Sequence, residues 1–283
     1  MVTGGAVRLT GSGLGCPTWP RCSGSALVPT NGLGIHKAIE FTNRMLTFVV
    51  AAVLVLTLLA AWRQRREVRL AAVALAGIPV QAVLGGIVVL TDLNPWLVAT
   101  HFLLSAVIIA VTALFWWRVT DHQLTPVPRG GLLLARATTA AAAAVLVIGT
   151  VVTGSGPHAG DLKNGRVHRI HISPAGASQL HADAVMVLIG LSVGMLALGY
   201  ALGLPERVRR AAWVLVVVEL SQAAIGYTQY FLHVPPLLVA LHMFGACLVW
   251  LAALAALFIL EPRASSFAAE TREPAPQNKR LIA

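Results

Sequence analysis

Four polar side chains in long apolar stretches are the residues best suited to chemistry. His101, His181 and His242 lie near the start of three apolar segments, and Glu40 lies near the start of a fourth. Imidazole nitrogens bind metal ions and haem iron, whereas a carboxylate accepts protons or stabilises positive charge. Because an ionisable group in a membrane segment is costly, each is a functional candidate, with a hydrogen-bonded structural role as the alternative.

Glu40 shares one face of a predicted helix with two other polar residues. His36, Glu40 and Asn43 follow the spacing i, i+4, i+7, which at 100° per residue places them on one side. Residues 45–62 then continue without a charge, so the carboxylate lies at the mouth of an apolar span. Two interpretations stay open from this stretch alone: a site beside a bound ligand, and a carboxylate among lipid headgroups.

The three histidines and Asn43 are predicted to lie at similar depth in the outer half of a membrane. His181 and His242 are 61 residues apart, and Asn43 and His101 are 58 apart, so two halves of the chain correspond in register. Two histidines on facing helices in apolar surroundings suit the two axial positions of a haem iron. A zinc site would need three or four clustered ligands. The pattern therefore favours haem ligation.

The composition is typical of a polytopic membrane protein. The 283 residues are 57% hydrophobic and 11% charged, and their mean hydropathy is +0.77. A soluble domain does not tolerate such a composition at its surface. The net charge of +10 comes from short arginine clusters between apolar runs, which is the pattern of the positive-inside rule and argues against nucleic acid as a partner.

Seven segments are long enough to cross a hydrocarbon core of about 30 Å. The predicted spans are residues 38–62, 70–90, 96–117, 132–153, 179–201, 211–231 and 236–260. Counting Lys and Arg places the linkers 63–69, 118–131 and 202–210 in the cytoplasm. We therefore expect a multi-pass protein of the cell membrane, with its histidines toward the extracytoplasmic side.

An internal repeat relates the two halves. QAVLGG begins at Gln81, 20 residues before His101, and QAAIGY begins at Gln222, 20 residues before His242. The repeat predicts an all-α fold of two four-helix bundles. A VTG motif closes an apolar helix in the second half but opens the chain in the first, so we expect seven of eight helices, the first being absent. The predicted domains are an N-terminal half at residues 1–131, a C-terminal half at 132–260 and a disordered tail at 261–283.

These motifs together resemble the haem A synthase family of membrane enzymes, which oxidise the methyl group of haem O to the formyl group of haem A. The resemblance rests on TGGAVRLTGSGLGCPTWPRC, HKAIEFTNR, VVTGSGPHAGD, the ATH that ends at His101, the QLHAD around His181 and the ALH before Met243. It covers nearly the whole chain except the tail. It implies two four-helix halves, an oxidoreductase, a haem b cofactor and haem O as the substrate.

The resemblance also implies a role for each candidate residue. It makes His181 and His242 the axial ligands of haem b, His101 a ligand of the substrate haem and Glu40 the essential carboxylate beside that substrate. The family usually has a histidine three residues after this glutamate, where this chain has Asn43. Three outcomes follow: His101 alone holds the iron and leaves an open position, which we favour; His36 substitutes; or the first half is impaired.

Two further pairs of residues have alternative interpretations. Cys16 and Cys22 in CPTWPRC lie on the predicted external side, where disulfides persist. The resemblance implies a redox-active or structural pair there, and we favour a structural bridge over an electron relay. Arg8 and Arg44 could bind haem propionates, because a guanidinium matches carboxylate geometry, or could lie among headgroups.

Partners and rival functions follow from the same features. We expect a haem O synthase, an electron-transfer partner and membrane lipid as partners, and a homo-oligomer stays open. A non-enzymatic bis-histidine electron carrier of the cytochrome b type would use the same histidines without needing Glu40. A transporter could share the repeat and the buried polar groups, but the outer depth of the histidines and the lack of an intramembrane charge relay argue against it.

Overall fold

Helices make up all the regular structure in the described part of the chain. The computed structural model describes residues 1–22, 34–120, 127–158, 160 and 168–260. Its helices are α1 (Val2–Leu9), α2 (Ile35–Gln64), α3 (Val68–Leu90), α4 (Pro95–Val119), α5 (Arg129–Ser155), α6 (Pro174–Ala201), α7 (Glu206–Phe231) and α8 (Pro236–Leu260). Helices α2 to α8 are each long and apolar enough to cross a membrane. The prediction of an all-α, multi-pass membrane protein with seven spans is confirmed.

The observed helices differ from the predicted segments at two places. Residues 2–9, predicted to be part of an external segment, form the short helix α1. The linker predicted at 202–210 ends at Pro205, because Glu206 already begins α7 and the arginines after it lie on its first turns. Proline is well tolerated just before a helix, because at that position it removes no hydrogen bond of the helix. The tail at 261–283, predicted to be disordered, lies outside the described residues.

Prolines fix where the three histidine-bearing helices begin. Pro95 opens α4 after Asn94, whose side chain accepts a hydrogen bond from the backbone of Trp96 at 3.0 Å. Pro174 opens α6 after Ser173, which caps the helix in the same way, and Pro236 opens α8. A proline at the first helical position has no N–H to leave unpaired and a backbone angle already suited to a helix. The depth of each histidine is thereby set by its distance from a fixed start.

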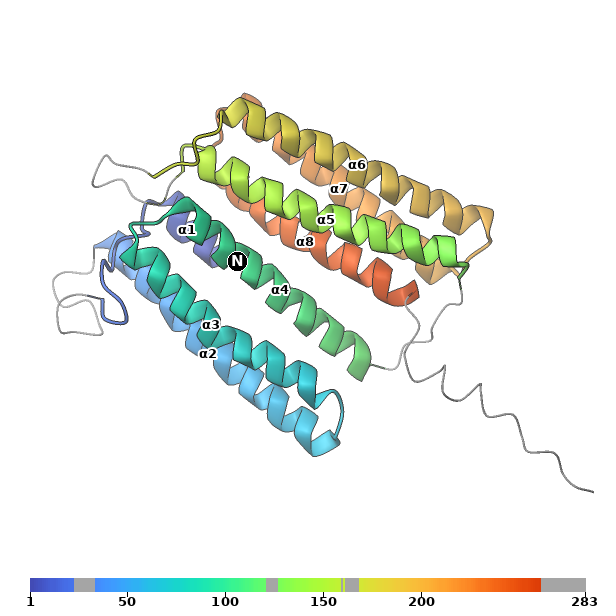
Figure 1. Cartoon of the computed structure of the whole chain (residues 1–283), viewed down its shortest axis with the longest axis horizontal. Helices are drawn as coiled ribbons and strands as arrows, with labels where there is room; N and C mark the ends of the chain where they lie inside the picture. Colours follow the sequence, from blue (N-terminus) through green and yellow to red (C-terminus); the bar gives the residue numbers. More distant parts are fainter. Residues whose placement is uncertain (23–33, 121–126, 159, 161–167, 261–283) are drawn as a thin grey trace, which may run out of the picture.

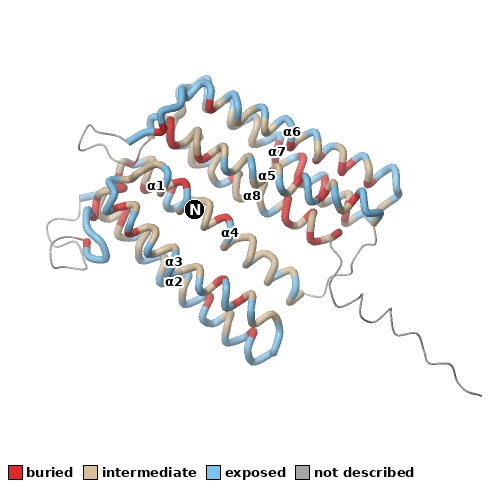
Figure 2. Tube along the Cα trace, in the orientation of Figure 1, coloured by how far each residue is buried: buried red, intermediate tan, exposed pale blue. Residues whose placement is uncertain are grey.

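The best-packed region lies within α5 to α8. Helix α5 packs against α6 and α8, and α7 packs against both of those helices, so the four close into a bundle (Figure 1). Its interior contains large buried side chains such as Leu188 and Leu215, with alanines such as Ala142 and Ala212 between them. Small residues allow membrane helices to approach closely, where van der Waals packing holds them together. Figure 2 shows buried positions recurring along these helices.

The remaining helices join this bundle through α4 and α1. Helices α2, α3 and α4 pack in chain order, and α4 also contacts α5 and α8 (Figure 1). The indole N–H of Trp250 on α8 donates to the carbonyl of Ala106 on α4 at 3.0 Å. Helix α1 packs between α2 and α8. The N-terminal part of the chain is therefore held against the second bundle by both polar and apolar contacts.

Candidate functional site

His181 and His242 form an imidazole pair between α6 and α8. Their ring centroids are 6.3 Å apart, and the ring planes are inclined by 75°. Both residues are half-buried. The Nδ1 atom of each ring is buried and makes no hydrogen bond to a described residue. Two unpaired imidazoles that face each other across a helical bundle are unusual for a purely structural role, because buried polar atoms are normally hydrogen-bonded.

Backbone of the preceding helix lies near each of the two rings. The ring of His181 lies near the backbone of Val145 on α5, and the ring of His242 lies near the backbone of Gln222 on α7. A metal-ligating histidine usually turns its second ring nitrogen toward a backbone carbonyl or a carboxylate in this way.

The separation of the rings fits a single metal ion between them. Imidazole nitrogens bind metal ions at about 2 Å, so two rings on opposite sides of one ion have centres roughly 6 Å apart. The measured 6.3 Å between His181 and His242 agrees with that distance. No cluster of three or more His, Cys, Asp or Glu side chains that could hold a metal ion exists among the described residues. Two axial imidazoles therefore suit haem iron better than a zinc ion.

A glycine on the preceding helix packs against each of the three candidate histidines. A Cβ atom added at Gly149 on α5 would lie 3.2 Å from Cε1 of His181, and one at Gly226 on α7 would lie 3.4 Å from Cε1 of His242. The corresponding distance from Gly85 on α3 to His101 is 3.1 Å. The absence of a side chain thus allows each imidazole to lie directly against the neighbouring helix.

His101 has the same kind of environment in the first half. Its Nδ1 is buried without a hydrogen bond to a described residue, as in the other two histidines. The side-chain amide of Gln81 on α3 donates to the backbone carbonyl of His101 at 2.9 Å and to the hydroxyl of Ser105 at 2.6 Å. These bonds fix the depth of α4 against α3 beside the histidine.

Asn43 and His36 differ in what surrounds them. Asn43 is half-buried on α2, at the position where the family resemblance implies a histidine. The Nδ1 atom of His36 lies 3.0 Å from the hydroxyl of Ser12, so that ring nitrogen is engaged in a hydrogen bond. This bond engages only Nδ1 of His36, so it does not distinguish among the three outcomes predicted for the first half.

Glu40 lies in a closed network with Arg44 and the loop that precedes α2. Its Oε2 accepts from the backbone N–H of Cys16 at 2.6 Å, and its Oε1 accepts from Arg44 at 2.5 Å and 3.1 Å. Arg44 also donates to the carbonyl oxygens of Cys16, Thr18 and Arg21. The exposed fraction of the side chain is 5% for Glu40 and 19% for Arg44. The carboxylate is therefore paired, buried and attached to the loop.

Cys16 and Cys22 are joined by a disulfide that closes this loop. Their exposed fractions are 0% and 1%, so both sulfur atoms are buried. The loop is held on α2 by the Glu40 and Arg44 hydrogen bonds just described. A buried bridge is poorly accessible to a protein or small-molecule thiol, which favours a structural role over an electron relay.

Arg8 joins the first helix to the second half. Its Nε donates to the carbonyl of His158, and its Nη2 donates to the carbonyl of Thr153 at 2.5 Å. The ring of His158 in turn lies 2.8 Å from the carbonyl of Val234. Burial lowers the pKa of Arg8 to about 10, which still leaves the guanidinium charged at neutral pH. The Nε and Nη2 atoms of Arg8 thus donate to backbone carbonyls, and these hydrogen bonds are not available to a propionate.

The structure thus groups the predicted residues into three places. His181 and His242 meet between α6 and α8, Glu40 and Arg44 meet at the disulfide loop, and Arg8 reaches across to the second half. Sequence reasoning missed the glycines that face the imidazoles and the hydrogen bond of Ser12 to His36. A signal for the glycines existed, since QAVLGG and QAAIGY both contain one four residues after the glutamine.

Comparison with known proteins gives a consistent result. The sequence matches a family model described as cytochrome oxidase assembly protein over residues 1–38 and 35–160. It is 30% identical over 203 residues to the haem A synthase of Alkalihalophilus pseudofirmus, covering 67% of this chain and 68% of that protein. It is 30% identical over 243 residues to the haem A synthase of Halalkalibacterium halodurans, covering 80% of each. The haem A synthase of Listeria welshimeri is 36% identical over 113 residues, which is 38% of this chain and 37% of that protein.

Proposed function

Since this chain belongs to the haem A synthase family, we propose that it oxidises the methyl group of haem O to the formyl group of haem A. The observation that carries this proposal is the His181 and His242 pair, whose spacing of 6.3 Å accommodates one iron between two imidazoles. Family membership supplies the reaction class. The imidazole pair supplies a place for a redox group in a bundle that contains no other metal-ligand cluster among its described residues.

We propose that His181 and His242 are the residues that would hold a haem b in the C-terminal half, residues 132–260. Gly149 and Gly226 lie beside the Cε1 and Nδ1 atoms of the two rings, which allows both imidazoles to pack against the neighbouring helices. A haem b held there would supply one-electron transfer between the ferric and ferrous states. The protein's part is to hold the two imidazoles at a fixed spacing in a low-dielectric bundle.

The N-terminal half, residues 1–131, is the proposed site for the substrate haem O. His101 is the imidazole that would bind the substrate iron, and Asn43 stands where the family usually has the other histidine. An amide is a poor iron ligand but can hydrogen-bond to a water or an oxygen species. We therefore expect the substrate iron to be five-coordinate or water-ligated, rather than held by two imidazoles.

Glu40 is proposed to act as a charge beside the substrate, with its position set by Arg44. Conversion of a methyl group to an aldehyde charges the reacting centre, and a fixed carboxylate stabilises developing positive charge without reorganising. Because Glu40 already accepts hydrogen bonds from Arg44 and from the backbone of Cys16, this role fits it better than that of a free proton acceptor. The same contacts hold the disulfide loop over the N-terminal end of α2.

The cellular setting is part of the proposal. Seven spans place the protein in a membrane, and the arginine-rich linkers favour the cell membrane with the histidine ends toward the extracytoplasmic side. A haem O synthase is the expected source of the substrate. With water as the source of the formyl oxygen, oxidation of the methyl group releases electrons and protons, so an electron-transfer partner is needed to accept the electrons.

Extraction of haem after co-expression with a haem O supply tests the proposed reaction. We expect mass analysis to detect a formyl haem in the extract, and to detect none when the chain is not expressed. Recovery of haem b without any formyl haem would instead identify a non-enzymatic electron carrier, and recovery of no haem from the purified chain would overturn the ligand assignment as well.

Substitution of Gly149 by alanine is expected to weaken haem binding in the second half. The new Cβ would lie 3.2 Å from Cε1 of His181, so the imidazole must shift by a few tenths of an ångström. Changes beside a metal ligand weaken metal binding by roughly 10- to 100-fold, and we expect the lower end of that range. Haem content per polypeptide and the Soret maximum measure the effect.

Gly190 on α6 provides the matched control for this substitution. It is also a helical glycine of the second bundle, but a Cβ added there meets no atom within 4 Å. Gly190→Ala should therefore bind haem like the parent chain. Equal haem content in the Gly149 and Gly190 variants would show that the glycine does not position the imidazole.

Replacement of both Cys16 and Cys22 by serine is expected to lower stability while leaving the chemistry in place. A disulfide that closes so short a loop contributes about 2 kcal/mol by restricting the unfolded chain. The thermal midpoint of the purified protein should fall, and the initial rate of haem A formation at low temperature should change little. A rate that falls at least tenfold at unchanged thermal midpoint would support an electron relay instead.

A further inference from the structure

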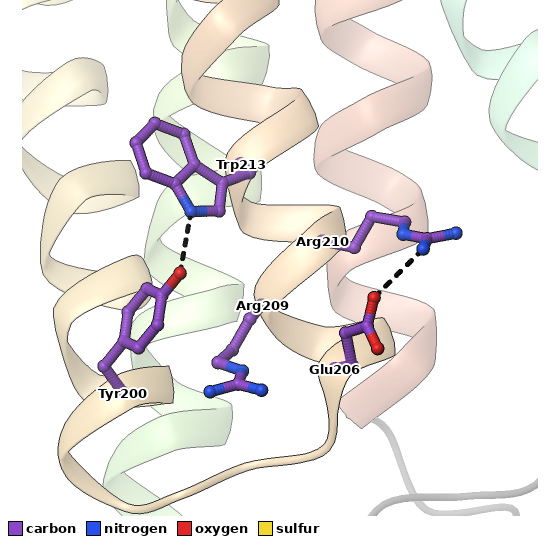
Figure 3. A pocket seen from close by; sticks show the side chains of 5 residues that line it. All are labelled: Tyr200, Glu206, Arg209, Arg210 and Trp213. Carbon is purple, nitrogen blue, oxygen red and sulfur yellow. Dashed lines mark hydrogen bonds and ion pairs between the residues drawn. The ribbon is translucent and has the colours of Figure 1, made fainter.

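A pocket at the far end of the second bundle has no part in the proposed reaction. It is lined by Tyr200 at the end of α6 and by Glu206, Arg209, Arg210 and Trp213 on the first turns of α7 (Figure 3). The 19 positions that separate Tyr200 from His181 on α6 correspond to roughly 28 Å along a helix. The pocket is therefore too distant to contact a ligand of the imidazole pair.

Side chains of the pocket retain polar hydrogens that can donate hydrogen bonds to a ligand. The indole N–H of Trp213 donates to the hydroxyl of Tyr200 at 3.1 Å, which leaves the proton of that hydroxyl for another acceptor. The guanidinium carbon of Arg209 lies 5.1 Å from the centre of the Tyr200 ring. Figure 3 shows these three side chains together between the ends of α6 and α7.

The pocket carries an uncompensated positive charge. The carboxylate of Glu206 is paired with Arg210 at 3.0 Å, and Figure 3 shows this pair pointing away from Tyr200. No ion pair in the described part of the chain involves Arg209. Stacking on Tyr200 orients the guanidinium without using its N–H groups, so these donors and the Tyr200 hydroxyl can meet one anion.

The neighbouring surface indicates that this anion is attached to an apolar body. Leu202 in the turn after α6 and Val214 and Val217 on α7 are exposed, and both helices are long enough to cross a membrane. Tyr and Trp are enriched at the level of the lipid headgroups, where one end of the ring is apolar and the other is wet. A phosphodiester whose acyl chains continue along α7 satisfies both the charge and the apolar surface.

The repeat offers an internal comparison. Gln222 and His242 on α7 and α8 correspond to Gln81 and His101, 141 positions earlier. By the same offset Arg209 and Trp213 correspond to Val68 and Ala72 on α3, whereas Arg210 corresponds to Arg69. The arginine and indole are therefore specific to the second half, and the repeated architecture does not require them.

We propose that Tyr200, Arg209 and Trp213 form a binding site for the headgroup of an anionic phospholipid. The guanidinium of Arg209 and the hydroxyl of Tyr200 donate to the phosphate, and the exposed side chains of α7 contact the acyl chains. The site would anchor the α6 and α7 end of the bundle at the membrane interface. It is independent of haem chemistry, and it would stand even if the proposed reaction were wrong.

Native mass spectrometry of the full chain in detergent tests this site with phosphatidylglycerol, phosphatidylcholine and inorganic phosphate as probes. We expect phosphatidylglycerol to bind the parent chain more tightly than phosphatidylcholine. Arg209→Gln should weaken phosphatidylglycerol binding by about fivefold, since one arginine near the membrane surface contributes on that scale. Tyr200→Phe, which keeps the ring and loses the hydroxyl, should weaken it by a smaller factor.

Arg69→Gln is the matched control, because it removes one exposed arginine from the first turn of α3, next to the Val68 counterpart of Arg209 and with no tyrosine or tryptophan in residues 68–77. This variant should bind phosphatidylglycerol with an affinity within about twofold of that of the parent chain. A loss of about fivefold in this variant would show that the effect of Arg209→Gln comes from general surface charge, which would overturn the proposed site. Equal binding of the two lipids, or parental binding by Arg209→Gln, would overturn the proposal. Competition by inorganic phosphate as effective as phosphatidylglycerol would overturn the lipid assignment in favour of a simple anion site.

Discussion

Alanine at His181 or at His242 is expected to abolish the b-type haem absorbance of the purified chain. Each substitution leaves one imidazole with no partner across the 6.3 Å gap between α6 and α8. Because changes merely beside a ligand weaken metal binding by roughly 10- to 100-fold, loss of the ligand itself should weaken it by at least about 100-fold. Absorbance spectra of the reduced protein, taken per mole of polypeptide, measure the loss.

His171 provides the matched control for these two substitutions. His171 is an exposed histidine of the segment that precedes α6. Its replacement by alanine therefore removes an imidazole without altering the pair of His181 and His242. His171→Ala should keep the parental spectrum. A Soret band unchanged in both His181→Ala and His242→Ala would refute the ligand assignment. A band that shifts to a high-spin form without disappearing would show that the remaining histidine alone retains the group.

Neutralising Glu40 is expected to reduce haem A formation strongly while the fold persists. Glu40→Gln retains the size of the side chain and one acceptor oxygen, but it removes the charge that pairs with Arg44. A preorganised group that stabilises developing charge contributes about 10²- to 10³-fold to a rate, and we expect a loss of at least about 100-fold. Haem A formed per mole of purified protein measures this effect.

Glu40→Ala should reduce both the activity and the stability. It leaves the N–H of Cys16 and the guanidinium of Arg44 without their buried acceptor. Loss of one member of a buried ion pair costs about 3–5 kcal/mol. Because Arg44 is partly exposed and keeps three backbone carbonyl partners, we expect roughly 2 kcal/mol, at the middle of the range for an unpaired buried group.

Glu67→Gln is the matched control for the glutamate variants. Glu67 pairs with Arg118 at 3.5 Å, but the exposed fraction of the side chain is 31% for Glu67 and 46% for Arg118. Exposed ion pairs contribute less than about 1 kcal/mol, so this variant should resemble the parent chain in stability and in haem A formation. Normal haem A formation by Glu40→Gln would reduce Glu40 to a structural residue that anchors the disulfide loop.

The amino-acid sequence by itself determined the class of the fold and the identity of the family. Uncharged runs of about 20 residues can satisfy their backbone in lipid only as helices, so composition alone predicts the spans. The spacing of Pro95 and Pro236 from His101 and His242 predicts equal depth, because a helix advances by a fixed rise per residue. The motifs around Glu40 and the histidines indicated the family, which the comparisons confirmed.

Only the tertiary structure decided which side chains meet. Sequence spacing gives depth along one helix, but the rotation of neighbouring helices depends on packing between residues far apart in the chain. The glycine contacts of the imidazoles, the attachment of Glu40 to Cys16 and the reach of Arg8 to Thr153 all depend on such rotation. The same holds for the Tyr200 and Arg209 pocket, since those residues lie at the ends of two different helices and their meeting depends on the angle of a four-residue turn.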